Sequence, residues 1–252
     1  MDFLRKLPPG ARVLDLGART GSFQSPRGDL IVIRADLDLP AARPADPYVA
    51  ADAARLPFAA GSFDAVVSNH SLEHFVELEP AVREIGRVLV PGGGLYIAVP
   101  DATTITDRIY RCLGRGGGHV NAFRGPADVT GVVERLAGVH HRATVPLISS
   151  LSFLNARNFT ARPPRKIALF AFGNERFLAV LMWLLKSVDR RLGTRLGHYG
   201  WAFYFGSAEP ATEDVWWNVC VRCGSGHPDG SLPLSRTYAC PQCGGWNLRS
   251  GI

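Results

Sequence analysis

The segment Val13–Phe23, which reads VLDLGARTGSF, limits the fold of this chain more than any other. It joins a short apolar run containing Asp15 to two glycines, Gly17 and Gly21. Such an apolar run predicts a buried β-strand. Glycines directly after it permit a tight turn in which backbone N–H groups approach a ligand closely. The segment therefore predicts a strand that leads into a ligand-binding loop.

Strand and helix patterns alternate along the rest of the chain. We expect strands within 11–17, 29–38, 48–58, 63–69, 94–101, 140–148 and 199–206. Apolar residues at helical spacing predict a helix over 78–90, ended by the PGGG that follows. A second helix is predicted over 126–138, between a proline and a glycine. This alternation predicts a doubly wound α/β sheet with its ligand at the carboxyl ends of the strands.

Two segments do not fit the alternation. Residues 148–198 separate the last two expected strands by far more than an ordinary connection. We therefore expect a helical insertion or lid there. Residues 211–252 form a tail that contains four cysteines. The predicted organisation is a core of 1–147 plus 199–210, an insertion at 148–198 and a small tail module at 211–252.

Four of the five cysteines follow the pattern C-x2-C-x16-C-x2-C. They are Cys220, Cys223, Cys240 and Cys243. Each pair is followed by a glycine, and the spacing is typical of the two knuckles of a zinc ribbon. Four thiolates leave no open position on a tetrahedral ion. The tail therefore predicts a structural Zn²⁺ site.

The formal net charge of +6 is concentrated around an apolar run, 177–185, inside the basic segment 161–195. The run has about half of the roughly 20 residues that a membrane-spanning helix needs. The N-terminus shows no apolar stretch of a secretory signal. We expect a cytoplasmic protein whose apolar stripe packs in a core. The alternative is peripheral membrane contact through 161–195. The pattern does not indicate an oligomeric state.

Four segments in order resemble the class I S-adenosylmethionine-dependent methyltransferases. They read VLDLGARTG, RADLD, ADAARLPFAAGSFDAVVSNHSLEH and EIGRVLVPGGGLYIAVP, and the likeness covers Arg12 to about Leu147. The resemblance implies a seven-stranded Rossmann-like methyltransferase sheet that binds S-adenosyl-L-methionine. SLEHF and GGHVNAF are further similar to methyltransferases of glycan and lipid-glycan biosynthesis.

The resemblance also implies a set of cofactor-binding residues. They are Asp15, Gly17, Ala18, Arg19, Gly21, Asp36, Asp52, Ala53, Ser68 and Asn69. In the family the first acid supports the turn or the methionine amino group, and the glycines leave room for the cofactor. Asp36, preferred over Asp38, matches the acid that binds the ribose hydroxyls. Asp52 and Ala53 match the position near the adenine, and Ser68 and Asn69 match the stretch that faces the reactive methyl.

The loop departs from the family pattern at Arg19, which replaces the middle glycine. In addition, Pro26 and Gly28 limit the helix that usually follows to one turn at most. Three interpretations remain open. In the first, the backbone of Arg19 makes the turn while its side chain points outward. In the second, the Arg19 guanidinium pairs with the methionine carboxylate of the cofactor. In the third, the site is degenerate and binds no cofactor.

The candidate catalytic residues are His119, His70 and Glu73. His70 and Glu73 follow the strand expected at 63–69, and His119 lies in a glycine-rich segment. A histidine with a pKa near neutral suits general-base catalysis, although each of these side chains also has a structural interpretation.

The resulting hypothesis is methyl transfer to a small or lipid-linked acceptor, such as a sugar. One alternative is an RNA methyltransferase that uses the ribbon to bind its substrate. Nucleic acid is less favoured because Arg222, Arg236 and Arg249 are the only basic residues within the ribbon. The other alternative is a degenerate, non-catalytic binding module.

Overall fold

The computed structural model describes residues 2–41, 46–113, 119–155, 174–210 and 217–250. The chain divides into two compact units. The core unit comprises Met1–Asp101, His119–Val145 and Trp201–Glu213. The cysteine unit comprises Ala102–Gly118, Pro146–Gly200 and Asp214–Ile252. The insertion and the tail expected from the sequence thus fall in one compact unit, and their division into separate domains stays a prediction.

A seven-stranded sheet has the order β3-β2-β1-β4-β5-β7-β6. The strands are β1 (Arg12–Leu16), β2 (Ile31–Asp36), β3 (Tyr48–Ala50), β4 (Phe63–Asn69), β5 (Leu89–Pro100), β6 (His141–Ile148) and β7 (His198–Gly206). The pairs among the first five strands are parallel. The expected doubly wound, seven-stranded sheet is confirmed. Because chain order reverses between β1 and β4, ligands are expected at the carboxyl ends of these two strands.

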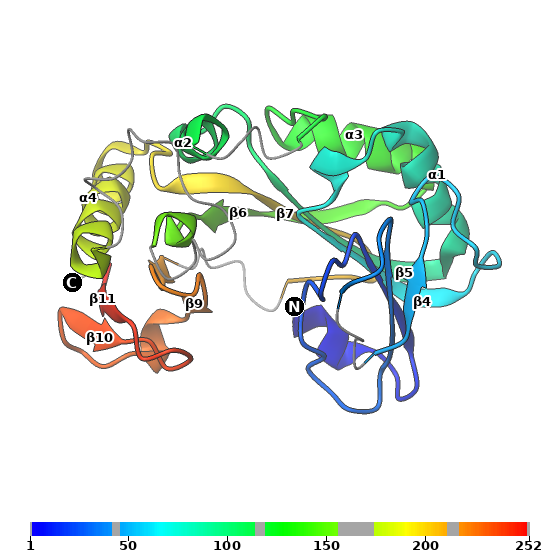
Figure 1. Cartoon of the computed structure of the whole chain (residues 1–252), viewed down its shortest axis with the longest axis horizontal. Coiled ribbons are helices and arrows are strands. Elements are labelled where there is room, and N and C mark those ends of the chain that lie inside the picture. Colours follow the sequence, from blue (N-terminus) through cyan, green and yellow to red (C-terminus); the bar gives the residue numbers. More distant parts are fainter. Residues whose placement is uncertain (1, 42–45, 114–118, 156–173, 211–216, 251–252) are drawn as a thin grey trace. The chain divides into compact units, whose positions relative to one another are not determined.

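Two helices of the core unit pack against each other (Figure 1). They are α1 (Leu78–Val88) and α3 (Pro126–Ala137). As the sequence predicts, α3 begins at a proline and ends at Gly138, which has a φ of 66°. Gly86 lets the helices approach, since a Cβ there would lie 2.4 Å from the carbonyl oxygen of Ala137.

The boundary between α1 and β5 differs from the sequence prediction. The helix ends at Val88, and the strand begins at Leu89 and continues through the proline and the three glycines. A register shift against β4 accommodates this stretch. A Cβ on Gly93 would lie 2.3 Å from the Leu89 side chain, so the glycines serve the strand rather than ending the helix.

Residues 17–30, which follow β1, contain turns and bends without a helix. The prediction of one helical turn at most is therefore confirmed. The loop returns directly to β2, and no helix N-terminus faces the carboxyl end of β1 from this segment. Short 3-10 segments occur at Asp2–Lys6, Leu72–His74, Ser152–Leu154 and Asp229–Ser231.

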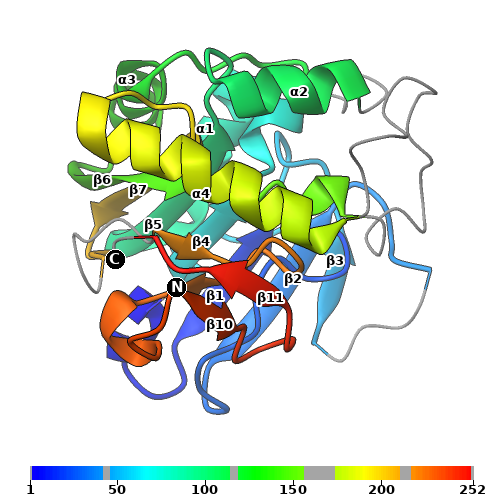
Figure 2. The same cartoon turned by 90° about the vertical axis from the view of Figure 1, so that its left-hand side faces the viewer.

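The cysteine unit contains α2 (Ile105–Leu113), α4 (Glu175–Leu192) and two small hairpins. The hairpins pair β8 (Asn218–Val219) with β9 (Gly226–His227), and β10 (Thr237–Ala239) with β11 (Trp246–Leu248). The long helix α4 contacts β11, as Figure 2 shows. None of the helices in the described part of the chain has the length and apolar character needed to cross a membrane. Most of the basic segment before α4, 161–173, lies outside the described residues.

Candidate functional site

The loop after β1 turns sharply against the end of β2. The N–H groups of Gly17 and Ala18 donate to the Ala35 carbonyl at 2.8 and 3.1 Å, and Gly21 N–H donates back to Ala18 at 2.6 Å. Gly17 has a φ of 74°, and a Cβ there would lie 2.3 Å from the Cβ of Ser71. Both the conformation and the close approach require glycine.

Arg19 occupies the position where the family pattern has its middle glycine. Its φ of 48° is in the left-handed region that favours glycine. Its side chain is exposed, and its backbone N–H donates to Asp36 Oδ2 at 2.7 Å. This geometry favours the interpretation in which the Arg19 backbone makes the turn.

Asp36 ends β2 beside this loop and is half-buried, whereas Asp38 is exposed. Its second carboxylate oxygen accepts the N–H of Leu37 at 2.8 Å. Each carboxylate oxygen has two lone pairs, so both oxygens keep capacity for further donors such as hydroxyl groups. The position agrees with the ribose role that the resemblance implies for Asp36.

Asp15 is fully buried beneath the loop. Its carboxylate accepts the Ser22 N–H at 3.0 Å and also contacts the Ser22 hydroxyl and the Arg34 guanidinium. Burial raises the pKa of Asp15 above its ordinary value, while Ser22 and Arg34 oppose that shift. Asp15 therefore supports the turn, one of the two roles that the resemblance implies.

Arg34 is a site residue that the sequence reasoning missed. It lies in β2, is buried, and also pairs with Asp46 at 2.7 Å and donates to the Phe23 carbonyl at 3.0 Å. A Cβ on Gly21 would approach its guanidinium to 3.0 Å. The available signal was an arginine directly after the apolar residues Ile31–Ile33 of this strand, because buried charges need partners.

Asp52 and Ala53 follow β3. The Asp52 carboxylate accepts the Ala54 N–H at 2.9 Å and pairs with Arg55 at 3.0 Å, so it caps its own turn. Ala53 packs against the apolar core. The adenine role of this position stays a prediction.

Ser68 and Asn69 end β4 and connect it to the loop after β1. The buried Ser68 hydroxyl lies 2.6 Å from that of Ser71, which donates to the Leu16 carbonyl at 2.9 Å. The Asn69 side chain donates to the Ser22 carbonyl at 3.3 Å. These contacts hold the carboxyl ends of β1 and β4 together.

A cluster of three histidines and one carboxylate lies just beyond β4. Glu73 Oε1 is 3.8 Å from His70 Nδ1 and 4.0 Å from His74 Nε2, and the Glu73 side chain is buried. The rings of His74 and His119 meet edge to face, with centroids 4.8 Å apart. The structure thus brings together His70, Glu73 and His119 from the sequence prediction and adds His74.

His70 has an unusual backbone and environment. Its φ is 56°, and its imidazole is 32% exposed. Burial lowers the pKa of His70 to about 4, and the nearby His119 and His74 add to the shift. The imidazole is therefore neutral at neutral pH.

Backbone contacts hold His119 in the cluster. The N–H groups of the next two residues, Val120 and Asn121, donate to the Glu73 carbonyl at 2.8 and 3.0 Å. The Asn121 side chain donates to the carbonyls of Leu72 and Phe75 at 2.9 and 2.7 Å. A segment more than 40 residues away in sequence is thereby fixed against the turn after β4.

The four cysteine thiols of the cysteine unit converge. Cys220 and Cys243 Sγ are 3.6 Å apart, and Cys223 and Cys240 Sγ are 3.7 Å apart. Four sulfurs bonded to one Zn²⁺ at about 2.3 Å stand about 3.8 Å apart at the corners of a tetrahedron. The spacing of the thiols therefore fits one tetrahedral ion.

The two cysteine turns have the same backbone pattern. Gly224 and Gly244 have φ angles of 80° and 69°, and each donates to the carbonyl of the first cysteine of its pair at 2.8 Å. The N–H of Arg222 lies 3.4 Å from Cys220 Sγ, as does the side-chain amide of Asn247. Such N–H groups stabilise thiolate sulfur.

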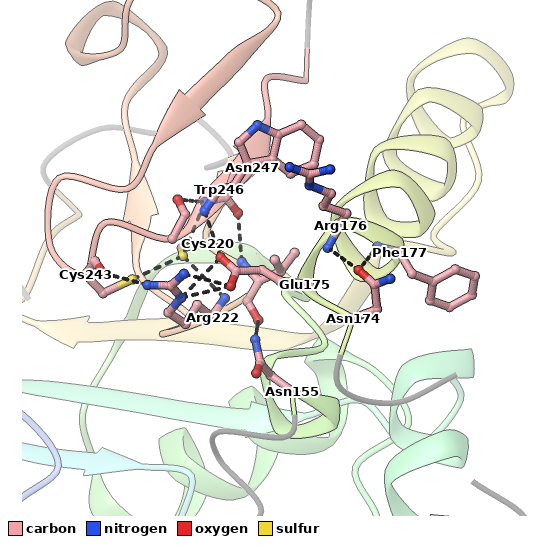
Figure 3. A network of polar contacts seen from close by, with 12 residues as sticks. Asn155, Asn174, Glu175, Arg176, Phe177, Cys220, Arg222, Cys243, Trp246 and Asn247 are labelled. Carbon is pink, nitrogen blue, oxygen red and sulfur yellow. Dashed lines mark hydrogen bonds and ion pairs between the residues drawn. The ribbon is translucent and has the colours of Figure 1, made fainter. Parts of the chain in front are cut away.

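Arg222 attaches one cysteine turn to the start of α4. It donates to Glu175 at 2.8 and 3.0 Å and to the Cys243 carbonyl at 3.0 Å. Glu175 also accepts the Trp246 N–H at 2.7 Å. Figure 3 shows the Glu175 carboxylate facing both partners.

The doubly wound sheet, the glycine loop and the acid that ends β2 define a Rossmann-like fold. Residues 14–97 match the family model Methyltransf_11, described as a methyltransferase domain. Residues 14–97 of this chain are therefore similar to a methyltransferase domain.

A demethylmenaquinone methyltransferase from Renibacterium salmoninarum is 38% identical over 120 residues, which cover 42% of this chain and 51% of that protein. The chain thus matches about half of this relative's length. The YcgJ protein from Bacillus subtilis has a TM-score of 0.53 at 16% identity, covering 80% of this chain and 94% of its own. A methyltransferase from Anabaena variabilis has a TM-score of 0.52 at 17% identity, covering 79% and 92%. At these identities the structural likeness shows the fold alone.

Proposed function

We propose that this chain transfers a methyl group from S-adenosyl-L-methionine to a small or lipid-linked acceptor. The observation that carries the proposal is the position of the His70 cluster. This cluster lies at the carboxyl end of β4, and β4 is adjacent to β1 in the sheet. In this proposal the loop after β1 and Asp36 at the end of β2 bind the cofactor. Relatives named demethylmenaquinone methyltransferases support an acceptor of this kind.

The residues present fit the cofactor at its ribose end. Asp36 is half-buried, retains acceptor capacity and stands beside the left-handed turn at Arg19. Gly17 and Gly21 let the loop pack closely on Ser71 and Arg34, and Ser68 and Asn69 fix the neighbouring strand end. Asp15 acts from beneath the loop, and the Asp52–Ala53 turn lies on the adenine side.

When bound, the cofactor supplies an electrophilic methyl on a sulfonium, which leaves as a neutral thioether when the methyl bonds to the acceptor. His70 takes the proton that the acceptor atom loses as this bond forms, and its lowered pKa makes it a weak base that suits an acceptor group that is itself acidic. The Glu73 carboxylate lies 3.8 Å from His70 Nδ1, and the His119 ring packs edge to face against that of His74. Placement of the acceptor in line with the methyl supplies much of the rate.

Calorimetry with S-adenosyl-L-methionine tests the cofactor site, and methyl release from labelled cofactor tests the reaction. We expect Arg19→Ala to change the affinity less than threefold, because the backbone and not the guanidinium makes the turn. A loss above tenfold, about 1.4 kcal/mol, would favour pairing of Arg19 with the methionine carboxylate. Absence of binding by the folded wild-type chain would favour the non-catalytic binding module.

The cysteine cluster holds a structural Zn²⁺ in this proposal, because the sulfur spacing fits a tetrahedral ion and four thiolates fill it. Metal analysis of the purified chain is expected to give zinc that Cys240→Ser removes. Nucleic acid is a weaker candidate partner for the ribbon. Arg222 and Arg249 pair with Glu175 and Asp229, which neutralises their charge.

Peripheral membrane contact through α4 is consistent with a lipid-linked acceptor. Phe177, Val180 and Leu184 recur at helical spacing and are 47%, 42% and 48% exposed. Arg176 and Arg191 lie on the same helix. Co-sedimentation with anionic vesicles tests this contact, and Val180→Asp is expected to reduce it. Equal co-sedimentation of the variant would contradict it.

A further inference from the structure

We propose that Glu73, His74 and His119 hold one divalent first-row transition-metal ion at the carboxyl end of β4. Their ligand atoms all lie within 4.8 Å of one another. Two imidazoles and one carboxylate form a donor set that binds Zn²⁺ and Fe²⁺ while leaving coordination positions open. This ion is distinct from that of the four cysteines, which belong to the other unit.

The burial of the three groups suits an open metal site. Glu73 is 2% exposed, so its carboxylate is desolvated and a cation beside it offsets that cost. His74 is 41% exposed, which leaves a route from solvent to the ion. The carboxylate is therefore the fixed ligand, and His74 is the ligand that adjusts.

Only small movements are needed to close the site. Ligand atoms around a tetrahedral ion stand about 3.4 Å apart when the bonds are about 2.1 Å. Glu73 Oε1 and His74 Nε2 are already 4.0 Å apart, and every other pair of ligand atoms lies within 4.8 Å. His119 needs no new backbone position, because Val120 and Asn121 already bond to the Glu73 carbonyl.

The local backbone explains why these residues form a site rather than a chance cluster. The 3-10 turn Leu72–His74 presents Glu73 and His74 from consecutive positions. The Asn121 side chain bonds to Leu72 and Phe75, and these bonds fix the segment that carries His119 against both ends of that turn. Outer contacts of this kind orient metal ligands.

The role of the ion in catalysis rests on the proposed methyl-transfer function. The binding of the ion does not depend on that function. An open coordination position next to His70 would take an oxygen of the acceptor and favour its deprotonated form. The class of acceptor that this selects carries a hydroxyl or enol oxygen at the methylated position.

The test uses the full chain with zinc retained in the cysteine site, titrated with Co²⁺. We expect one Co²⁺ per chain with visible d–d absorption and no thiolate-to-cobalt charge-transfer band. Glu73→Gln and His74→Ala are each expected to weaken binding at least tenfold. Glu73→Gln keeps the side-chain shape, and His74 is exposed enough for truncation without loss of the fold, which circular dichroism checks.

His140→Ala is the matched control, because this histidine is exposed and lies outside the cluster. Its cobalt affinity should stay within twofold of the wild-type value. Absence of the d–d band, or equal cobalt affinity in the wild type and both cluster variants, overturns the metal site. Calorimetry with S-adenosyl-L-methionine on the same samples separates the two proposals: cobalt binding without cofactor binding rejects the methyl-transfer function and leaves the metal site standing.

Discussion

Single side chains decide whether the loop after β1 can form. Gly17 combines a left-handed backbone with close contact to Ser71, and neither tolerates a Cβ. We expect Gly17→Ala to lower the free energy of unfolding by about 2–4 kcal/mol. Urea denaturation measures this loss. Gly28→Ala is the control, since a Cβ there meets nothing within 4 Å, and it should stay within about 0.5 kcal/mol of wild type.

The buried pair of Arg34 and Asp15 is the second decisive feature of this loop. Arg34→Met leaves a fully buried carboxylate without its guanidinium, which should cost about 3–5 kcal/mol of unfolding free energy. Replacing both residues, Arg34→Met with Asp15→Asn, should recover part of that loss, because no charge is then buried alone. A double-mutant cycle in urea measures the coupling. Strictly additive losses would contradict the pairing.

The start of α4 depends on a side-chain cap. Asn174 accepts the N–H groups of Arg176 and Phe177 at 3.0 and 3.3 Å. Asn174→Ala should therefore cost about 1 kcal/mol. Asn174→Asp keeps the acceptor and adds a charge that the helix N-terminus favours, so its stability should match or exceed wild type. Thermal denaturation followed by circular dichroism compares the variants, and equal losses in both would reject the cap.

Elements with strong local signals were predictable from the sequence. The apolar run FDAVVSN gave β4 with its observed bounds, Phe63–Asn69, and the proline and glycine around α3 marked both of its ends. The predicted start of β5 was wrong because a PGGG run is typical of a helix end, whereas here close packing against Leu89 requires Gly93 within the strand. Local patterns do not contain that contact.

The site was predictable only where its residues are close in sequence. The loop, Asp36 and the residues after β4 follow directly from strand ends. His74 was not among the candidates, and its contact with His119 depends on backbone bonds across more than 40 residues. Arg34 was recognisable as a charged residue inside a strand. Its partner Asp15 was not, because the two residues are adjacent only through the register of β1 and β2.

Part of the apolar core of the cysteine unit is built on its cysteine turns. Among the described residues, one buried cluster comprises Leu151, Leu154, Leu178, Ala179, Met182 and Val221, and Val221 lies between Cys220 and Cys223. A structural zinc site supplies about 10–16 kcal/mol of binding free energy. The stability of the cysteine unit should therefore depend on its metal far more than that of the core unit.

Removal of zinc with a chelator should unfold the cysteine unit and leave the core unit folded. Hydrogen exchange measured by mass spectrometry should show lost protection in α4 and in residues 217–250, with protection retained in β1, β4 and β5. Cys240→Ser should reproduce this pattern without chelator, whereas His74→Ala should not, because its ligand site lies in the core unit. Protection lost equally in both units would mean that they fold as one cooperative body. Unchanged protection after complete zinc removal would instead show that the apolar packing of the cysteine unit is sufficient by itself.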